Sequence, residues 1–105
     1  MRIISKKILQ EYWQKEPNAE QPLKSWYSIT EKAQWKTHNE LKQQFGKTSI
    51  INKKRVVFDI HGNTYRLIVD IEYKIKMVFV VWVGTHSEYD KINVENVVYK
   101  KPDKN

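Results

Sequence analysis

Several side chains in the middle and last third of the chain are of the types that can cleave RNA without a metal ion. Such cleavage removes a proton from a 2′-hydroxyl as it attacks the adjacent phosphate, delivers a proton to the leaving 5′-oxygen and neutralises charge on the phosphorane. Histidine, lysine and tyrosine can move protons, and arginine can hold a phosphate through two hydrogen bonds. The candidates, in chain order, are Lys53, Lys54, Arg55, Arg66, Lys74, Lys76, His86 and Tyr89.

Other kinds of catalytic centre have no signature in the sequence. There is no HExxH, no GxSxG, no phosphate-binding loop and no pair of carboxylates at metal-binding spacing. The absence of cysteine excludes a disulfide scaffold, a cysteine-ligated metal and thiol catalysis. No glycine-rich turn follows the strand predicted at residues 77–83, so we expect neither a nucleotide nor any other cofactor.

The charge balance favours a polyanionic partner. Nineteen basic and 12 acidic residues give a net charge of +7, which suits binding to nucleic acid. Residues 46–76 are the most basic part, with 7 basic and 3 acidic side chains. A basic surface can also serve solubility alone, so charge by itself separates these interpretations only weakly.

Length and composition indicate one globular domain. The chain has 105 residues, of which 40% are hydrophobic and 12% aromatic, which argues against intrinsic disorder. The longest apolar run, residues 77–83, is far shorter than the ~20 residues needed to span a bilayer. The N-terminus also lacks the pattern of a signal peptide. We therefore expect a soluble, cytoplasmic domain with no membrane association.

Residues 1–45 have the apolar spacing of helices. A first helix is predicted after Ser5 and must end near Pro17, because proline disfavours the helical conformation of the residue before it. A second helix is predicted from about Gln21 to Trp35, and a short third helix over residues 38–45.

The pattern changes to that of strands from about Thr48. Residues 55–60 and 64–71 flank a Gly62-Asn63 turn, which predicts a β-hairpin. Pairing outward from the turn gives one apolar face. On the other face two opposite-charge pairs fall into register, Asp59 with Arg66 and Arg55 with Asp70.

The remaining segments complete a small sheet. Residues 77–83 form a near-continuous apolar run typical of a strand covered on both faces, and residues 85–90 indicate a helical turn capped by Thr85 or Ser87. A short edge strand at 94–99 and a loose tail follow. The predicted fold class is α+β, with N-terminal helices packed on one face of a small antiparallel sheet.

Each candidate residue also has a purely structural interpretation. Arg66 can serve only to pair with Asp59, and the run from Lys53 to Arg55 can be a solvated edge. His86 can be a helix-start residue and Tyr89 a packing residue. From the residues alone, the chain is a small basic α+β domain that binds RNA.

Two segments carry a resemblance to a known family. The pattern Gly-Asn-x-Tyr-Arg-Leu at residues 62–67 and the pattern Thr-His-x-Glu-Tyr-Asp-Lys at 85–91 resemble the HigB toxins of the RelE-like superfamily. Trp26, Trp35 and Phe45 in the helical half fit as well. The resemblance covers roughly residues 1–92 as one RelE-like toxin domain, and leaves 93–105 as a C-terminal tail.

The resemblance implies a type II toxin that cuts mRNA, commonly on translating ribosomes. It also implies inhibition by a cognate helix-turn-helix antitoxin of the HigA type, so that DNA is contacted only indirectly through that complex. Arg66 would hold the scissile phosphate, His86 would transfer a proton, and Tyr89 would orient His86 or stack on a base. The expected RNA-binding residues are Lys53, Lys54, Arg55, Lys76 and Lys91.

Position 59 departs from the family pattern, because many relatives have asparagine where this chain has aspartate. A carboxylate paired with Arg66 would weaken the positive charge offered to a phosphate. Two other classes of function remain open: a non-catalytic module that binds RNA or the ribosome, and a protein-interaction domain for an acidic partner.

Overall fold

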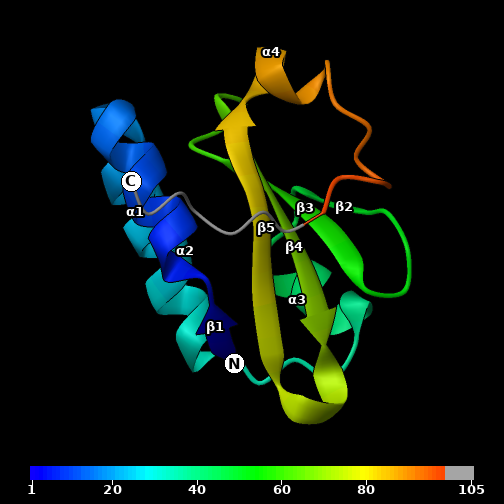
Figure 1. The fold of residues 1–105 in the computed structure, drawn as a ribbon. Coiled ribbons are helices and arrows are strands. Elements are labelled where there is room, and N and C mark those ends of the chain that lie inside the picture. Colours follow the sequence, from blue (N-terminus) through cyan, green and yellow to red (C-terminus); the bar gives the residue numbers. More distant parts are fainter. Residues whose placement is uncertain (99–105) are drawn as a thin grey trace.

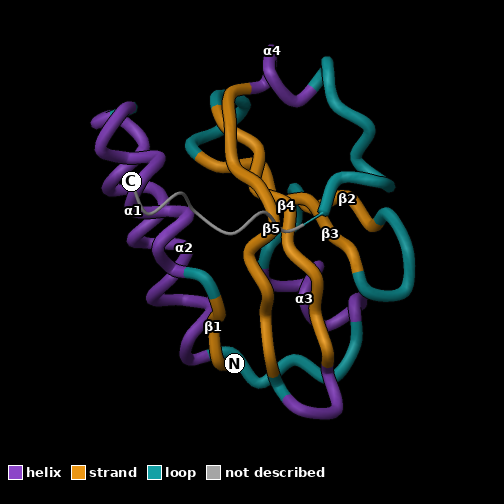
Figure 2. The backbone as a smooth tube through the Cα atoms, in the orientation of Figure 1, coloured by secondary structure: helices purple, strands orange, loops and turns teal. Residues whose placement is uncertain are grey.

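The structure is a computed structural model and describes residues 1–98. Helices occupy the first half and most of the sheet the second (Figures 1 and 2). The elements are β1 (Arg2–Ile4), α1 (Lys6–Lys15), a 3-10 turn (Pro17–Ala19), α2 (Glu20–Lys32), α3 (His38–Gln44), β2 (Thr48–Ile50), β3 (Arg55–Ile60), β4 (Tyr65–Glu72), a second 3-10 turn (Tyr73–Ile75), β5 (Met77–Thr85) and α4 (His86–Tyr89).

The five strands form one sheet in the order β1-β5-β4-β3-β2. The α+β class is confirmed, but the sheet is mixed, because β1 runs parallel to β5 while the other pairs are antiparallel. The sequence did not reveal β1. Three residues are too few to show the period of a strand, and the partner of Arg2 is Met77, far along the chain.

The predicted hairpin register is confirmed at all six pairs, from Ile60 opposite Tyr65 to Arg55 opposite Asp70. The turn is longer than predicted, with four residues, 61–64, between the paired strands. Gly62 has φ +65° and His61 has φ +55°, so both lie in the left-handed region. The amide of Thr64 closes the turn by donating to the carbonyl of His61 at 3.2 Å.

The helices cover one face of the sheet. The side chains of Leu9, Leu23 and Leu41, one from each helix, are fully buried there. Trp26 packs edge-on against Phe58, with ring centres 5.5 Å apart. The second helix ends at Lys32, earlier than predicted, and the α2–α3 connection carries Trp35, which packs against Phe45 instead.

The other face is covered by the chain that follows α4. Residues 91–97, here called the strap, run back over the sheet (Figure 1). Ile92, Val94 and Val97 pack against a separate apolar cluster from β3, β4 and β5, formed by Val57, Ile68 and Val81. Residues 94–98 form no strand, so the predicted edge strand is wrong over that range, and residue 99 onward lies outside the described part. Three strap carbonyls accept hydrogen bonds from a side chain, Arg55, instead of from a neighbouring strand.

Candidate functional site

The single helical turn α4 sits at the end of β5. Thr85 and Glu88 form a capping box, in which Thr85 Oγ1 accepts from the Glu88 amide at 3.1 Å and Glu88 Oε1 accepts from the Thr85 amide at 2.8 Å. The predicted cap at Thr85 is therefore confirmed. The His86 amide donates to the carbonyl of Thr64 at 3.0 Å, which ties α4 to the β3–β4 turn.

Gly84 allows the close packing beneath α4. A Cβ at this position would lie 2.4 Å from the Trp82 ring and 3.0 Å from Glu88 Oε1. Gly84 is also the residue opposite Arg66 in the β4–β5 register. Any side chain at 84 would thus displace the Trp82 indole or the cap.

Arg66 lies at this end of the sheet and is only 9% exposed. The predicted pair with Asp59 is present, with Nε 3.3 Å from Asp59 Oδ1. Nη2 donates to Asn63 Oδ1 at 2.5 Å, and Nη1 donates to the carbonyl of Tyr65 at 3.2 Å. The guanidinium is positioned by the hairpin itself, and a phosphate must compete with Asp59 and Asn63 for its donors.

Tyr89 packs over Arg66 from α4. The guanidinium carbon is 6.0 Å from the centre of the Tyr89 ring, and the Trp82 ring centre is 6.3 Å from it on β5. Burial raises the pKa of Tyr89, Arg66 opposes that rise, and the carboxylates of Asp59 and Asp90 add to it. The hydroxyl therefore remains protonated at neutral pH and can donate a hydrogen bond.

His86 lies beside Asp90, one helical turn further on. Nδ1 is 3.5 Å from Asp90 Oδ1, and the imidazole side chain is 44% exposed. Nδ1 itself is inaccessible to solvent and has no hydrogen-bond partner among the described residues. The exposed part of the ring therefore carries Nε2, which is the nitrogen available to a substrate.

These groups form one cluster. We call Asp59, Asn63, Arg66, His86, Tyr89 and Asp90 the α4 cluster. Of the three predicted catalytic residues, Tyr89 contacts Arg66, and His86 lies on the same helical turn as Tyr89, beside Asp90. An arginine, an imidazole and a phenol within one cluster can together hold a phosphate and exchange protons.

The predicted RNA-binding lysines are divided between the two ends of the sheet. Lys91 is exposed and directly follows the α4 cluster. Lys53, Lys54 and Lys76 are exposed at the opposite end, where β3 and β5 begin. The 8 residues of β4 separate the two ends by about 26 Å. Lys54 is paired with Glu72 at 2.6 Å, which raises its pKa.

Arg55 is placed differently from these lysines. It is 7% exposed, and its guanidinium is bonded to Asp70 and to three strap carbonyls. Because its donors are used within the protein, we leave Arg55 out of the RNA-binding set proposed below.

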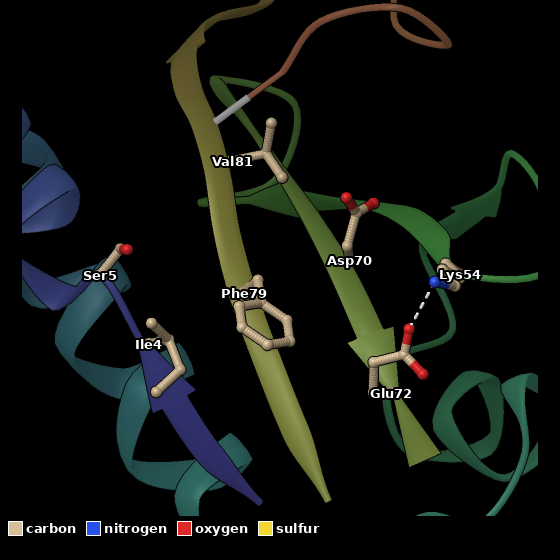
Figure 3. A pocket seen from close by; sticks show the side chains of 7 residues that line it. All are labelled: Ile4, Ser5, Lys54, Asp70, Glu72, Phe79 and Val81. Atoms are coloured by element: carbon tan, nitrogen blue, oxygen red, sulfur yellow. Dashed lines mark ion pairs between the residues drawn. The ribbon is translucent and has the colours of Figure 1, made fainter. Parts of the chain in front are cut away.

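A second concavity lies lower on the strap face. This groove has a volume of about 540 Å³. Figure 3 shows its lining, with Phe79 and Val81 on one strand and Asp70 and Glu72 on the next. Its lysine, Lys54, is the one paired with Glu72. The lining offers carboxylates and apolar surface, which do not suit a phosphate.

Two further structural findings concern the described residues. Within residues 1–98, no three or more His, Asp or Glu side chains gather closely enough to hold a metal ion. None of the helices in that range combines the length and apolar character that a membrane crossing requires.

Sequence reasoning missed the roles of Asn63 and Trp82. Asn63 was interpreted only as a turn residue, although its side chain accepts from Arg66. Trp82 lies near the end of the apolar strand, two residues before Gly84. A large ring two residues before a glycine is a signal that could have indicated packing across the glycine.

Comparison with known proteins gives two findings. The HigB toxin family, described as the RelE-like toxic component of a toxin–antitoxin system, matches residues 19–92. The chain is also similar to mRNA interferase HigB of Escherichia coli O6:H1, at 33% identity over 94 residues, which cover 88% of this chain and 91% of that relative. The family match includes every residue of the α4 cluster.

Proposed function

The chain belongs to the HigB family of RelE-like toxins, and from that premise we propose that it is an endoribonuclease that cleaves mRNA at the α4 cluster. The family is the toxic component of a toxin–antitoxin system, and the similar Escherichia coli protein is named an mRNA interferase. The observation that carries the proposal is the contact of Arg66 from β4 with Tyr89 from α4, the helical turn that also carries the half-exposed imidazole of His86.

The proposed reaction is an attack by a 2′-hydroxyl on the adjacent phosphate. The O2′–P bond forms, the P–O5′ bond breaks, one proton leaves the 2′-hydroxyl and one reaches the 5′-oxygen. His86 takes part in proton transfer through Nε2, because imidazole can accept and donate protons near neutral pH. Arg66 stabilises the negative charge on the phosphorane.

Tyr89 has the role of a stacking and donor residue in this proposal. Its described contacts are with Arg66 and Trp82. Asp90, rather than Tyr89, is the residue next to His86 Nδ1. We therefore favour base stacking for Tyr89 over the orientation of His86, because Asp90 is the neighbour of Nδ1 at 3.5 Å.

Lysines at both ends of the sheet would bind the RNA backbone. Lys91 is next to the α4 cluster, and Lys53, Lys54 and Lys76 would contact RNA about 26 Å away. Such a span suits a message held by a ribosome, where ribosomal RNA is also within reach. If the ribosome holds the message in an in-line geometry, few catalytic side chains are needed. We place this activity in the cytoplasm, where translation occurs.

The partner would be a small antitoxin that blocks the toxin. A toxin–antitoxin family implies such a partner. We propose an antitoxin of the HigA type with a helix-turn-helix domain, so that this chain reaches DNA only through the complex.

The test is brief expression of the wild-type chain, His86→Ala and Arg66→Ala in bacteria, followed by mapping of RNA 5′ ends. New ends within translated messages, formed by the wild type and greatly reduced in both variants at equal soluble level, are the expected result. Purified protein should then cut a message on translating ribosomes faster than the same RNA alone.

The pairing of Arg66 with Asp59 and Asn63, which compete with a phosphate for its donors, favours one second candidate, a non-catalytic RNA- or ribosome-binding module. In that case the wild type would produce no new RNA ends but would bind RNA with a steep salt dependence. That outcome would reject the nuclease.

A further inference from the structure

α4 is too short to hold its own position. It has 4 residues, and its intrahelical hydrogen bonds are few, so its place depends on what holds its two ends. The capping box and the Thr64 carbonyl hold the amino end. The carboxyl end continues directly into the strap (Figures 1 and 2).

The strap is held by one buried arginine. Arg55 Nε and Nη2 donate to the two oxygens of Asp70 at 2.7 and 2.8 Å. Its third nitrogen, Nη1, donates to the carbonyl of Val94 at 3.0 Å, and also to those of Glu95 and Val97. The planar guanidinium permits this division of donors between a carboxylate and the main chain, and an ammonium group does not.

The apolar contacts of the strap are separate from the main core. Val57, Ile68 and Val81 beneath the strap form their own cluster, on the sheet face opposite the helices, and Tyr89 packs against the same cluster. Loosening the strap therefore disturbs the surroundings of Tyr89 while the helix-covered core remains packed.

We infer that Arg55 and Asp70 are positioning residues for RNA cleavage, which fix the carboxyl end of α4 by clamping the strap. The inference rests on the proposed function, because it assigns the clamp to the reaction at the α4 cluster. It replaces the expectation that Arg55 binds RNA. In this inference the buried guanidinium lies at the other end of the hairpin and affects the α4 cluster only by holding the strap.

The first test compares Arg55→Lys and Arg55→Met with the wild type under single-turnover conditions, well below the melting temperature of each variant. We expect the maximal cleavage rate to fall between about 10- and 100-fold in both, because small misplacements of reacting groups cost rates of this order. KM for the RNA should stay within about twofold, as no backbone contact is lost. Lys42→Met is the matched control: it removes one positive charge, is exposed on α3, on the face of the sheet opposite the strap, and should leave both constants unchanged.

The lysine variant separates position from charge. If Arg55 contacted RNA, Arg55→Lys would keep most of the activity, whereas Arg55→Met would raise KM and reduce the salt dependence of binding. If Arg55 only stabilised the fold, both variants would cleave at the wild-type rate below their melting temperatures. Either result would overturn the inference.

Hydrogen exchange tests the clamp without activity. The amides of Asp90, Lys91 and Ile92 donate within and just after α4, to carbonyls of His86, Glu88 and Tyr89. In Arg55→Lys their exchange should accelerate by about tenfold or more while that of α2 is unchanged. Unchanged exchange at these amides would reject the clamp.

A further variant tests the clamp in case Arg55→Met does not fold. Val94→Ala loosens the strap but leaves the Arg55–Asp70 pair in place, and should reproduce the faster exchange and slower cleavage in a milder form. If the wild type cleaves no RNA although exchange responds as expected, the proposed function is wrong and the clamp is only a structural device. If cleavage is present and exchange does not respond, the clamp alone is wrong.

Discussion

Arg55–Asp70 and Arg66–Asp59 are cross-strand pairs on the same face of one hairpin, one towards each end. In the first pair the closest contact is 2.7 Å, two nitrogens contact two oxygens, and the third nitrogen is bonded to the strap. In the second the closest contact is 3.3 Å, with donors shared between Asp59, Asn63 and a main-chain carbonyl.

The difference lies in what covers each pair. Main-chain carbonyls cover Arg55, and they are held there by the apolar contacts of the strap. The ring of Tyr89 covers Arg66, and His86 lies on the same helical turn. Two arginines with the same cross-strand partner type therefore differ in use: the donors of one are committed to the fold, and those of the other are held by groups that a phosphate can replace.

The largest expected effect is on the Arg66 side of this comparison. Arg66→Ala should lower the rate of mRNA cleavage by about 10²- to 10³-fold, because a donor to the developing phosphorane charge is lost. Arg66→Lys should recover part of the lost cleavage rate, because lysine keeps the positive charge but cannot bind a phosphate through two hydrogen bonds as arginine does. A purified translation system with a defined message gives the rates. If Arg66→Ala cleaved RNA at the wild-type rate, the Arg66 guanidinium would have only a structural role. The two arginine–aspartate pairs would then not differ in function.

Double-mutant cycles should sharpen the comparison through stability. The coupling energy between Arg55 and Asp70, from Arg55→Met and Asp70→Asn, should be about 2 kcal/mol, because the pair is two-pointed and largely buried. That between Arg66 and Asp59 should be below about 1 kcal/mol, given the longer contact. Urea unfolding of the four variants in each cycle measures both. Equal coupling energies in the two pairs would contradict the view that Arg55–Asp70 is the stronger structural pair.

A smaller effect is expected from Asp59→Asn. Removing this negative charge beside Arg66 frees the guanidinium for a phosphate, so KM for RNA should fall about two- to fivefold at low salt, with little change in stability. The decrease in KM should disappear at high salt, because screening then removes the repulsion between Asp59 and the RNA phosphates in the wild type. An increase in KM would mean that the carboxylate positions Arg66 productively.

The smallest expected effect is on the free energy of unfolding at alkaline pH, through Tyr73, which lies at the same end of the sheet as Arg55. Burial raises the pKa of Tyr73 from 10.0 to about 12. Above pH 10.0 the unfolded chain loses the phenol proton before the folded chain does, so the stabilisation present below that pH is lost as pH rises towards about 12. Tyr73→Phe should weaken this decline, measured by urea unfolding at stepped pH. Since the Tyr73 hydroxyl contacts His38 Nδ1, the comparison is of slopes and not of absolute stability.

Local patterns were enough to predict much of this molecule. Alternation around the turn gave the hairpin register and both charge pairs, and Thr85, one of the two predicted caps of α4, is the cap observed. Motif resemblance selected Arg66, His86 and Tyr89, of which Arg66 and Tyr89 are in contact and His86 shares the helical turn of Tyr89. Their catalytic roles stay predictions.

Contacts between segments far apart in the chain could not be predicted from the sequence. β1 depends on pairing with residue 77 and beyond, and the burial of Arg55 depends on carbonyls 39 to 42 residues away. The hairpin register predicted the partner of Arg55, Asp70, but no local feature predicted that Arg55 is buried while Lys53 and Lys54 are exposed. The bonds that set it apart go to main-chain carbonyls, which carry no mark of residue type.

The parallel pairing of β1 with β5 has a consequence for folding of the chain. Arg2–Ile4 are separated from their partners, Met77–Phe79, by the three N-terminal helices and the β3–β4 hairpin, and α4 follows those partners. Non-local pairings of this kind close only after the intervening chain is available. The β1–β5 edge therefore closes only after the helices and the β3–β4 hairpin are available to fold.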